Sequence, residues 1–106
     1  MEIVKVNLMN YSDEVLKSEK PVLLDFYADW CGPCNVLAGE IHDFAEENDE
    51  YKVCKLDVDE SGELAQIYGV LSIPTVVLIK DGKEVDRFVG GREKADIEDF
   101  VNAHKN

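Results

Sequence analysis

Two cysteines and one acid lie close together in the stretch LLDFYADWCGPC, residues 23–34. Cys31 and Cys34 are three positions apart, and residues at that spacing share one face of a helix. On a helix their α-carbons would be roughly 5 to 6 Å apart, which is the separation that a disulfide requires. Such a pair can cycle between two thiols and one disulfide. The spacing therefore predicts thiol–disulfide exchange as the chemistry of this stretch.

Gly32 and Pro33, between the two cysteines, predict that a helix begins near Cys31. Proline is tolerated in the first turn of a helix because the N–H groups there have no intrahelical partner. The positive end of the helix dipole also favours a thiolate, which is the species that attacks a disulfide. We expect Cys31 to lie at the exposed tip of this helix and Cys34 one turn deeper, so that one thiol attacks while the other waits.

Asp25 lies inside an apolar run, with Leu24 and Phe26 as its neighbours. Loss of water around a carboxyl group raises its pKa, and a carboxyl group that titrates near pH 7 can exchange protons there. We expect Asp25 to serve Cys34, which must ionise before it can break a mixed disulfide. Lys55 lies in another buried-looking strand and would pair with Asp25 if the two strands are neighbours. The alternative is a buried ion pair, or a carboxylate bonded to the backbone, without a catalytic role.

The elements that position these residues follow from the spacing of apolar side chains. Alternating or continuous apolar residues predict strands, and apolar residues three or four apart predict helices. Asp81-Gly82 predicts a type I′ hairpin turn, because that turn needs φ > 0 at both central residues. We expect capped helices to begin at Asn10 or Ser12 and at Ser61. The predicted strands are residues 2–6, 21–28, 51–58, 75–80 and 84–89, and the predicted helices are residues 12–18, 31–48, 61–69 and 93–105. This order predicts an α/β protein whose mixed sheet carries helices on both faces.

Composition limits the class of protein. The chain has 106 residues, of which 45% are hydrophobic and 32% charged, which suits one globular domain spanning residues 1–106. Its net charge of −12 argues against binding to nucleic acid or to an anionic membrane. The apolar runs are shorter than the roughly 20 residues of a membrane-spanning helix. The start, MEIVKVNLMN, lacks the features of a secretory signal. We expect a cytoplasmic monomer; a mature chain whose signal has been removed is the alternative.

Across essentially its whole length the chain resembles the thioredoxin family. The resemblance rests on WCGPC at residues 30–34, on VLLDFYADW around the acid, on IPT at residues 73–75 and on VGG at residues 89–91. It implies a thioredoxin fold, in which four helices flank a central mixed sheet of five strands. It also implies reduction of disulfides in protein substrates, with a thioredoxin reductase as electron donor and with neither a metal nor a cofactor of its own.

The resemblance also implies a role for each site residue. Cys31 would be the nucleophile, Cys34 the resolving thiol, and Asp25 the proton acceptor and donor, with Lys55 modulating it. Pro74 would be a cis proline that faces the disulfide. The residues that would contact the partner protein are Trp30, Gly32, Pro33, Ile73, Pro74, Val89 and Gly90. Ordinary packing is the alternative for the apolar members of this set.

Three positions depart from the family pattern: Asn35 replaces a residue that is often basic, Gly39 a helix proline, and Tyr27 a common tryptophan. The third cysteine, Cys54, is expected to be a small core residue, with a regulatory or dimer-forming thiol as the alternative.

Three other functions compete with this interpretation. A zinc module would need a second pair of ligands. A disulfide oxidase or isomerase of the same fold usually carries another dipeptide between its cysteines and a secretory signal. A non-catalytic interaction domain would be expected to lack an active cysteine, whereas both are present here.

Overall fold

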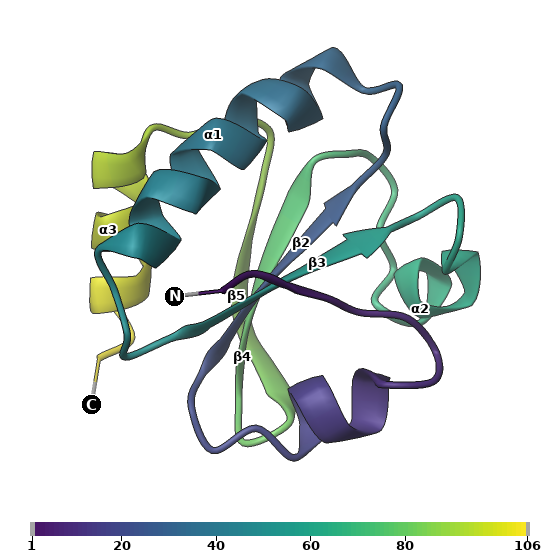
Figure 1. Ribbon diagram of the computed structural model, residues 1–106, viewed down its shortest axis with the longest axis horizontal. Coiled ribbons are helices and arrows are strands. Elements are labelled where there is room, and N and C mark those ends of the chain that lie inside the picture. Colours follow the sequence, from purple (N-terminus) through teal and green to yellow (C-terminus); the bar gives the residue numbers. More distant parts are fainter. Residues whose placement is uncertain (1, 106) are drawn as a thin grey trace.

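The computed structural model describes residues 2–105 and arranges them around one central sheet (Figure 1). In chain order the elements are β1 (Val4–Lys5), the π-helical segment η1 (Ser12–Leu16), β2 (Val22–Tyr27), α1 (Gly32–Glu46), β3 (Lys52–Asp57), α2 (Gly62–Ile67), β4 (Thr75–Lys80), β5 (Lys83–Val89) and α3 (Lys94–Asn102). Within the described residues, the predicted α/β fold with a five-stranded mixed sheet and four helical segments is confirmed.

The strands lie in the order β1-β3-β2-β4-β5. β1, β3 and β2 are parallel to one another, whereas β4 pairs antiparallel with both β2 and β5. Parallel strands need a crossover connection; the segment containing η1 joins β1 to β2, which lie on either side of β3, and the segment containing α1 joins β2 to its neighbour β3. In the register of the β2–β3 pair, Asp25 lies directly opposite Lys55. The strands that carry these two residues are therefore neighbours, which was the condition for their pairing.

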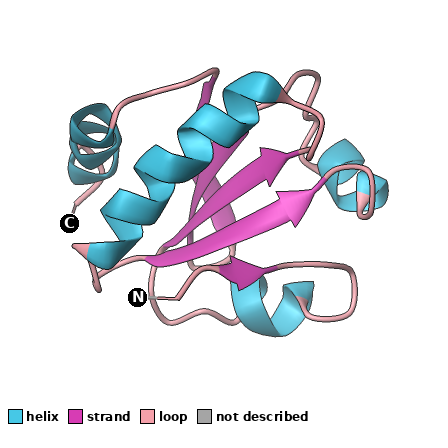
Figure 2. Ribbon diagram, turned by 45° about the horizontal axis from the view of Figure 1, so that its top comes forward, coloured by secondary structure: helices cyan, strands magenta, loops and turns pink. Residues whose placement is uncertain are grey.

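Helices cover both faces of the sheet, as Figure 2 shows. α1 and α3 lie on one face, and η1 and α2 on the other (Figure 1). Side chains alternate along a strand, so Leu23 of β2 belongs to the core beneath α1 and α3, while Leu24 and Phe26 belong to the core beneath η1 and α2. All three are fully buried, which confirms that β2 is covered on both faces. By the same alternation Asp25 faces α1.

Ser61 is the N-cap residue of α2 as predicted, but the side-chain hydrogen bonds predicted for the two caps do not form among the described residues. The Asn10 side chain accepts a hydrogen bond from the Asn7 N–H at 2.8 Å and donates one to the Lys5 carbonyl at 2.9 Å, so it closes the preceding turn. Ser12 lies inside η1, and Ser61 precedes α2 without a capping bond from its side chain to any described residue. Short polar side chains compete for several nearby backbone groups, and here the turn was favoured over the cap.

The first and last elements are shorter than predicted. β1 lies at the edge of the sheet, so it pairs with β3 alone. It is two residues long. α3 ends at Asn102, before the predicted end at Lys105. Helix ends commonly fray or tighten, which makes their boundaries the least predictable part of the pattern.

The hairpin between β4 and β5 turns at Asp81 and Gly82, whose φ angles are 53° and 78°. Both angles are positive, which confirms the predicted type I′ turn. A side chain at Gly82 would bring its Cβ to 3.4 Å from the carbonyl oxygen of Leu16, the last residue of η1. That contact is close to ordinary van der Waals distance, so the positive φ is the reason that the turn favours glycine.

Two glycine-to-alanine substitutions should change stability in opposite directions. Gly82→Ala is expected to lower the free energy of unfolding by about 1 kcal/mol or more, because alanine disfavours a left-handed backbone. Gly39→Ala is expected to raise it by about 0.5–1 kcal/mol, because Gly39 lies within α1 and its new Cβ would meet no atom within 4 Å. Urea unfolding of both variants measures the difference, and a shared sign would contradict the assignment of the turn.

Candidate redox site

Cys31 and Cys34 form a disulfide at the start of α1, with their α-carbons 5.2 Å apart. Cys31 is the N-cap residue of α1, and its Sγ accepts a hydrogen bond from the Cys34 N–H at 3.2 Å. Gly32 and Pro33 form the first positions of the helix and are exposed. The predicted helix start and the predicted separation of the α-carbons are therefore confirmed.

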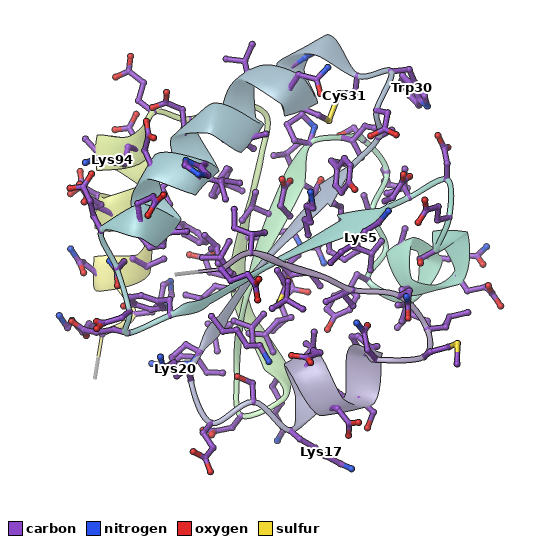
Figure 3. All side chains as sticks on the ribbon, viewed as in Figure 1. Lys5, Lys17, Lys20, Trp30, Cys31 and Lys94 are labelled. Atoms are coloured by element: carbon purple, nitrogen blue, oxygen red, sulfur yellow. A yellow bond between two sulfur atoms is a disulfide. The ribbon has the colours of Figure 1, made fainter. Side chains whose placement is uncertain are left out.

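Both cysteines are more buried than expected. Cys31 is 6% exposed and Cys34 is 2% exposed, because the disulfide packs against Ala28 and against the partly buried Tyr27 and Ile73. The prediction that Cys31 lies at an exposed tip is thus wrong for the disulfide form. Cys31 is still the more accessible of the two sulfurs, and Figure 3 places it beside Trp30 at the junction between β2 and α1.

Asp25 is buried beneath this junction, with 5% of its surface exposed. Its Oδ1 atom has no hydrogen-bond partner among the described residues, so the backbone-bonded alternative fails for this oxygen. Burial raises the pKa of Asp25 to about 7, and the nearby positive charge of Lys55 opposes that shift. Along β2, Asp25 lies between Leu23, which packs beneath α1, and Tyr27, which packs against the cysteines. The carboxyl group is therefore on the face of the sheet that α1 covers, two positions before Tyr27, which packs against the cysteines.

Lys55 does not occupy the buried position that its strand suggested. Its side chain is exposed, although its backbone pairs in register with Asp25. The Lys55 Nζ atom lies 5.7 Å from the centre of the Tyr27 ring. A long lysine stem can follow the protein surface and carry its ammonium group to water, which the apolar pattern of the strand cannot reveal.

The loop that faces the disulfide contains a cis peptide bond between Ile73 and Pro74, as the resemblance implied. The Ile73 carbonyl oxygen lies 4.0 Å from the Cys31 Sγ. Gly90, with a φ of 92°, donates its N–H to the Pro74 carbonyl at 2.9 Å. Pro74 is buried and Ile73 is half-buried. These contacts hold the loop against the cysteine pair.

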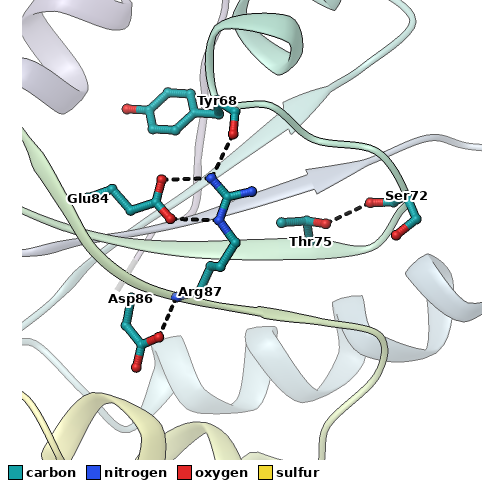
Figure 4. Close-up of polar contacts among 6 residues, drawn as sticks. All are labelled: Tyr68, Ser72, Thr75, Glu84, Asp86 and Arg87. Carbon is teal, nitrogen blue, oxygen red and sulfur yellow. Dashed lines mark hydrogen bonds and ion pairs between the residues drawn. The ribbon is translucent and has the colours of Figure 1, made fainter.

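Side chains anchor both ends of this loop (Figure 4). The Thr75 hydroxyl donates to the Ser72 carbonyl at 2.6 Å, and the Arg87 guanidinium donates to the Tyr68 carbonyl at 2.6 Å. Arg87 is itself held by two hydrogen bonds to the Glu84 carboxylate, at 2.6 and 2.7 Å. The residue after α2 is thereby fixed to β5, and the start of β4 is fixed to the loop.

An apolar hollow of about 200 Å³ lies beside the disulfide. Trp30, at its rim, is 72% exposed, and its Nε1–H donates to the Asp59 carboxylate at 2.7 Å. The residues that line the hollow are Trp30, Val58, Ala65, Val70, Leu71, Ser72 and Ile73. Of the predicted partner-binding residues, the structure thus brings Trp30 and Ile73 together in one hollow, whereas Val89 and Gly90 lie outside it.

Sequence reasoning missed two residues at this hollow. Leu71 is 98% exposed, which is unusual for a leucine, but nothing in its sequence neighbourhood indicates that exposure. Asp59 accepts the hydrogen bond of the Trp30 indole, yet it lies in the acidic stretch DVDE, residues 57–60, whose composition is that of an ordinary solvated loop. Val89 is 60% exposed, so simple core packing does not explain it.

The third cysteine lies in the core, away from the Cys31–Cys34 pair. Cys54 is fully buried, which confirms it as a core residue, and burial raises the pKa of its thiol to about 11. Residues 2–105 contain no group of three or more His, Cys, Asp or Glu side chains arranged to hold a metal ion. Within the same residues, helices with the length and apolar character needed to cross a bilayer are absent.

Comparison with known proteins establishes the family. The family model described as Thioredoxin matches residues 2–103. The chain belongs to the thioredoxin family. Similar curated proteins include the thioredoxin of Bacillus subtilis, which is 44% identical over 98% of this chain and 99% of its own length. Thioredoxins of Mycobacterium bovis and Rickettsia typhi are 46% and 40% identical, over 87% and 89% of this chain and 80% and 90% of their own lengths. As a member of the thioredoxin family with its cysteine pair at disulfide distance, the protein is a thiol–disulfide oxidoreductase.

Proposed function

We propose that this protein works in the reducing direction and transfers two electrons from its Cys31–Cys34 dithiol to a disulfide in a protein substrate. The observation that supports this proposal is the cysteine pair at the start of α1, above a buried acid that titrates near neutral pH. The helix N-terminus and the Cys34 N–H stabilise negative charge on the Cys31 sulfur.

In the first step, the Cys31 thiolate attacks one sulfur of the substrate disulfide. A mixed disulfide forms, and the second substrate sulfur leaves as a thiolate that takes a proton from water. Cys31 is the proposed nucleophile because it is the more accessible sulfur. It also accepts the backbone N–H that stabilises the thiolate.

In the second step, Asp25 accepts the proton of Cys34, and the resulting thiolate attacks the Cys31 sulfur. The Cys31–Cys34 disulfide forms, and the remaining substrate sulfur leaves and is protonated. The substrate has then gained two electrons and two protons. Lys55, opposite Asp25 in the sheet, modulates the proton affinity of the carboxyl group through its positive charge.

We assign binding of the substrate backbone to the surface around the disulfide. Trp30 and Ile73 line the apolar hollow, and Gly32 and Pro33 form the exposed helix start. We assign Pro74, Val89 and Gly90 to the same surface, because Gly90 bonds to the Pro74 carbonyl and Pro74 follows Ile73. A thioredoxin reductase would return the electrons. We further propose that the protein acts as a monomer in the cytoplasm and contributes there to redox homeostasis.

The reducing direction can be tested by an insulin-type disulfide reduction assay with candidate reductases, together with a measurement of the equilibrium potential against glutathione. We expect rapid reduction of insulin and a couple more reducing than glutathione. A strongly oxidising couple would instead favour the disulfide oxidase or isomerase alternative.

A further inference from the structure

We propose that Tyr27 is a positioning residue that holds the Lys55 ammonium group against its ring and thereby sets the electrostatic field at Asp25. This inference rests on the proposed proton role of Asp25, and it adds Tyr27 to the residues that control that role. Tyr27 would act through Lys55 and need not touch the substrate or the reacting sulfurs.

Strand geometry brings the three side chains together. Asp25 and Tyr27 are two positions apart on β2, so their side chains lie on the same face of the sheet. Lys55 lies opposite Asp25 on β3, and its Nζ atom is 5.7 Å from the centre of the Tyr27 ring. This distance is within the range of about 6 Å over which a cation is attracted to the face of an aromatic ring.

The strand register alone would not place the ammonium group there. Lys55 is exposed, and a lysine side chain has four flexible carbon atoms with which to reach solvent. Among the described residues Lys55 forms no salt bridge, so the Tyr27 ring is the group against which its Nζ lies. The Tyr27 ring thus favours one orientation of the Lys55 side chain, whose ammonium group could otherwise adopt several.

The other charges around Tyr27 have partners of their own. Lys5, on β1, pairs with Glu60 at 3.0 Å, and Asp57 on β3 accepts the Asp59 N–H at 2.9 Å. Asp29, beyond the end of β2, is exposed to solvent, which screens its charge. These groups surround Tyr27, but each of their charges is balanced by its own contacts or screened by solvent. Lys55 is the cation that lies opposite Asp25 in the sheet.

The position of this cation matters because Asp25 has so few other polar contacts. Its buried Oδ1 lacks a hydrogen-bond partner among the described residues, and the charge of Lys55 is the one that acts on the carboxyl group against the effect of burial. A Coulomb interaction weakens as two charges separate and as water enters between them. We expect an ammonium group released from Tyr27 to extend into solvent, where its attraction to the Asp25 carboxylate is weaker, so that Asp25 becomes harder to ionise.

The test is a ¹³C NMR titration of the Asp25 carboxyl group in the disulfide form, in which Cys31 and Cys34 do not titrate. Tyr27→Phe keeps the aromatic face and should leave the pKa of Asp25 unchanged. Tyr27→Leu removes the face and should raise that pKa by about 0.5 pH unit, the size expected when the screened attraction of one charge several ångströms away is lost. In a Lys55→Gln background, the same Tyr27→Leu substitution should produce no upward shift.

An equal shift in both backgrounds would overturn the proposal, because the ring would then act on Asp25 without Lys55. No shift in either background would also overturn it, because the ring would then have no effect on Asp25. A second measurement needs no substitution. The ε-methylene protons of Lys55 should resonate upfield in the wild-type protein, because they lie near the ring face, and ordinary chemical shifts there would equally contradict it. Neither readout uses turnover, so failure of the reductase assay and failure of this inference are separate results.

Discussion

Replacement of Cys31 by serine is expected to lower the rate of protein-disulfide reduction by at least about 10³-fold, to the background of the assay. A serine hydroxyl does not ionise near neutral pH and cannot form a disulfide, so both the attack and the mixed disulfide are lost. The loss should appear in kcat/KM with every protein disulfide tested. A single-turnover insulin reduction assay, starting from the fully reduced protein, measures it without any reductase.

Cys34→Ser should give a different result from Cys31→Ser. It leaves the attacking sulfur in place and removes the resolving one, so mixed disulfides with substrates should accumulate and be visible on non-reducing gels. Cys54→Ala is the matched control, because Cys54 is fully buried in the core away from the pair. It should keep turnover and lose only about 1 kcal/mol of stability. If Cys31→Ser trapped substrates and Cys34→Ser did not, the roles of the two cysteines would be reversed.

The parts of the fold that the sequence could predict depend on residues close together along the chain. The α1 start follows from Pro33 beside Cys31, and the hairpin follows from Asp81-Gly82, because helix-start chemistry and φ > 0 are properties of single residues and their neighbours. The burial of β2 follows from its continuous apolar run. Such local signals were sufficient to place the cysteine pair and the acid on their elements.

The parts that could not be predicted depend on contacts between distant residues. Asn10 was available as a helix cap, yet it bonds to Asn7 and Lys5, and its residue type allows either arrangement. Lys55 lies in a buried strand, but its stem carries the ammonium group out to the Tyr27 ring. Periodicity gives the face of a strand and not the direction of a long side chain, so the electrostatic surroundings of Asp25 needed the structure.

The same limit applies to the surface beside the disulfide. Trp30 was recognisable from its position next to the cysteines, but the hollow that it borders also requires Leu71 and Val58, from two other loops. The bond between Asp59 and the Trp30 indole joins residues 29 positions apart. Leu71, Val58 and Asp59 carry no sequence signal that separates them from ordinary loop positions.

Asp25→Asn is expected to stabilise the protein at neutral and alkaline pH. The pKa of Asp25 rises from 3.8 to about 7 on folding, so the folded state resists ionisation that the unfolded state allows. For a raised carboxyl pKa, stability is lost as the pH rises from about 4 to about 7, and the full cost is present above pH 7. A shift of about 3 pH units corresponds to about 4 kcal/mol as an upper bound. The asparagine amide also needs polar partners, so the observed gain should be smaller.

Urea unfolding at several pH values measures this effect as the difference between the variant and the wild type, in which the other carboxyl groups cancel. The gain should be largest above pH 7 and should shrink as the pH falls toward 4. Asp29→Asn is the matched control, because it removes one exposed negative charge four residues away and should change stability by less than about 0.5 kcal/mol at every pH. A gain independent of pH would mean that Asp25 does not titrate as its burial requires.

The Asp25→Asn variant should also resolve mixed disulfides more slowly, by about 10²-fold near pH 7, because Cys34 has lost the group that accepts its proton. The defect should diminish at high pH, where hydroxide can remove that proton directly. Attack by Cys31 does not use Asp25, so formation of the mixed disulfide should keep its wild-type rate in a rapid-mixing experiment. If the first step slowed while the second did not, Asp25 would accept the proton of Cys31 and not that of Cys34.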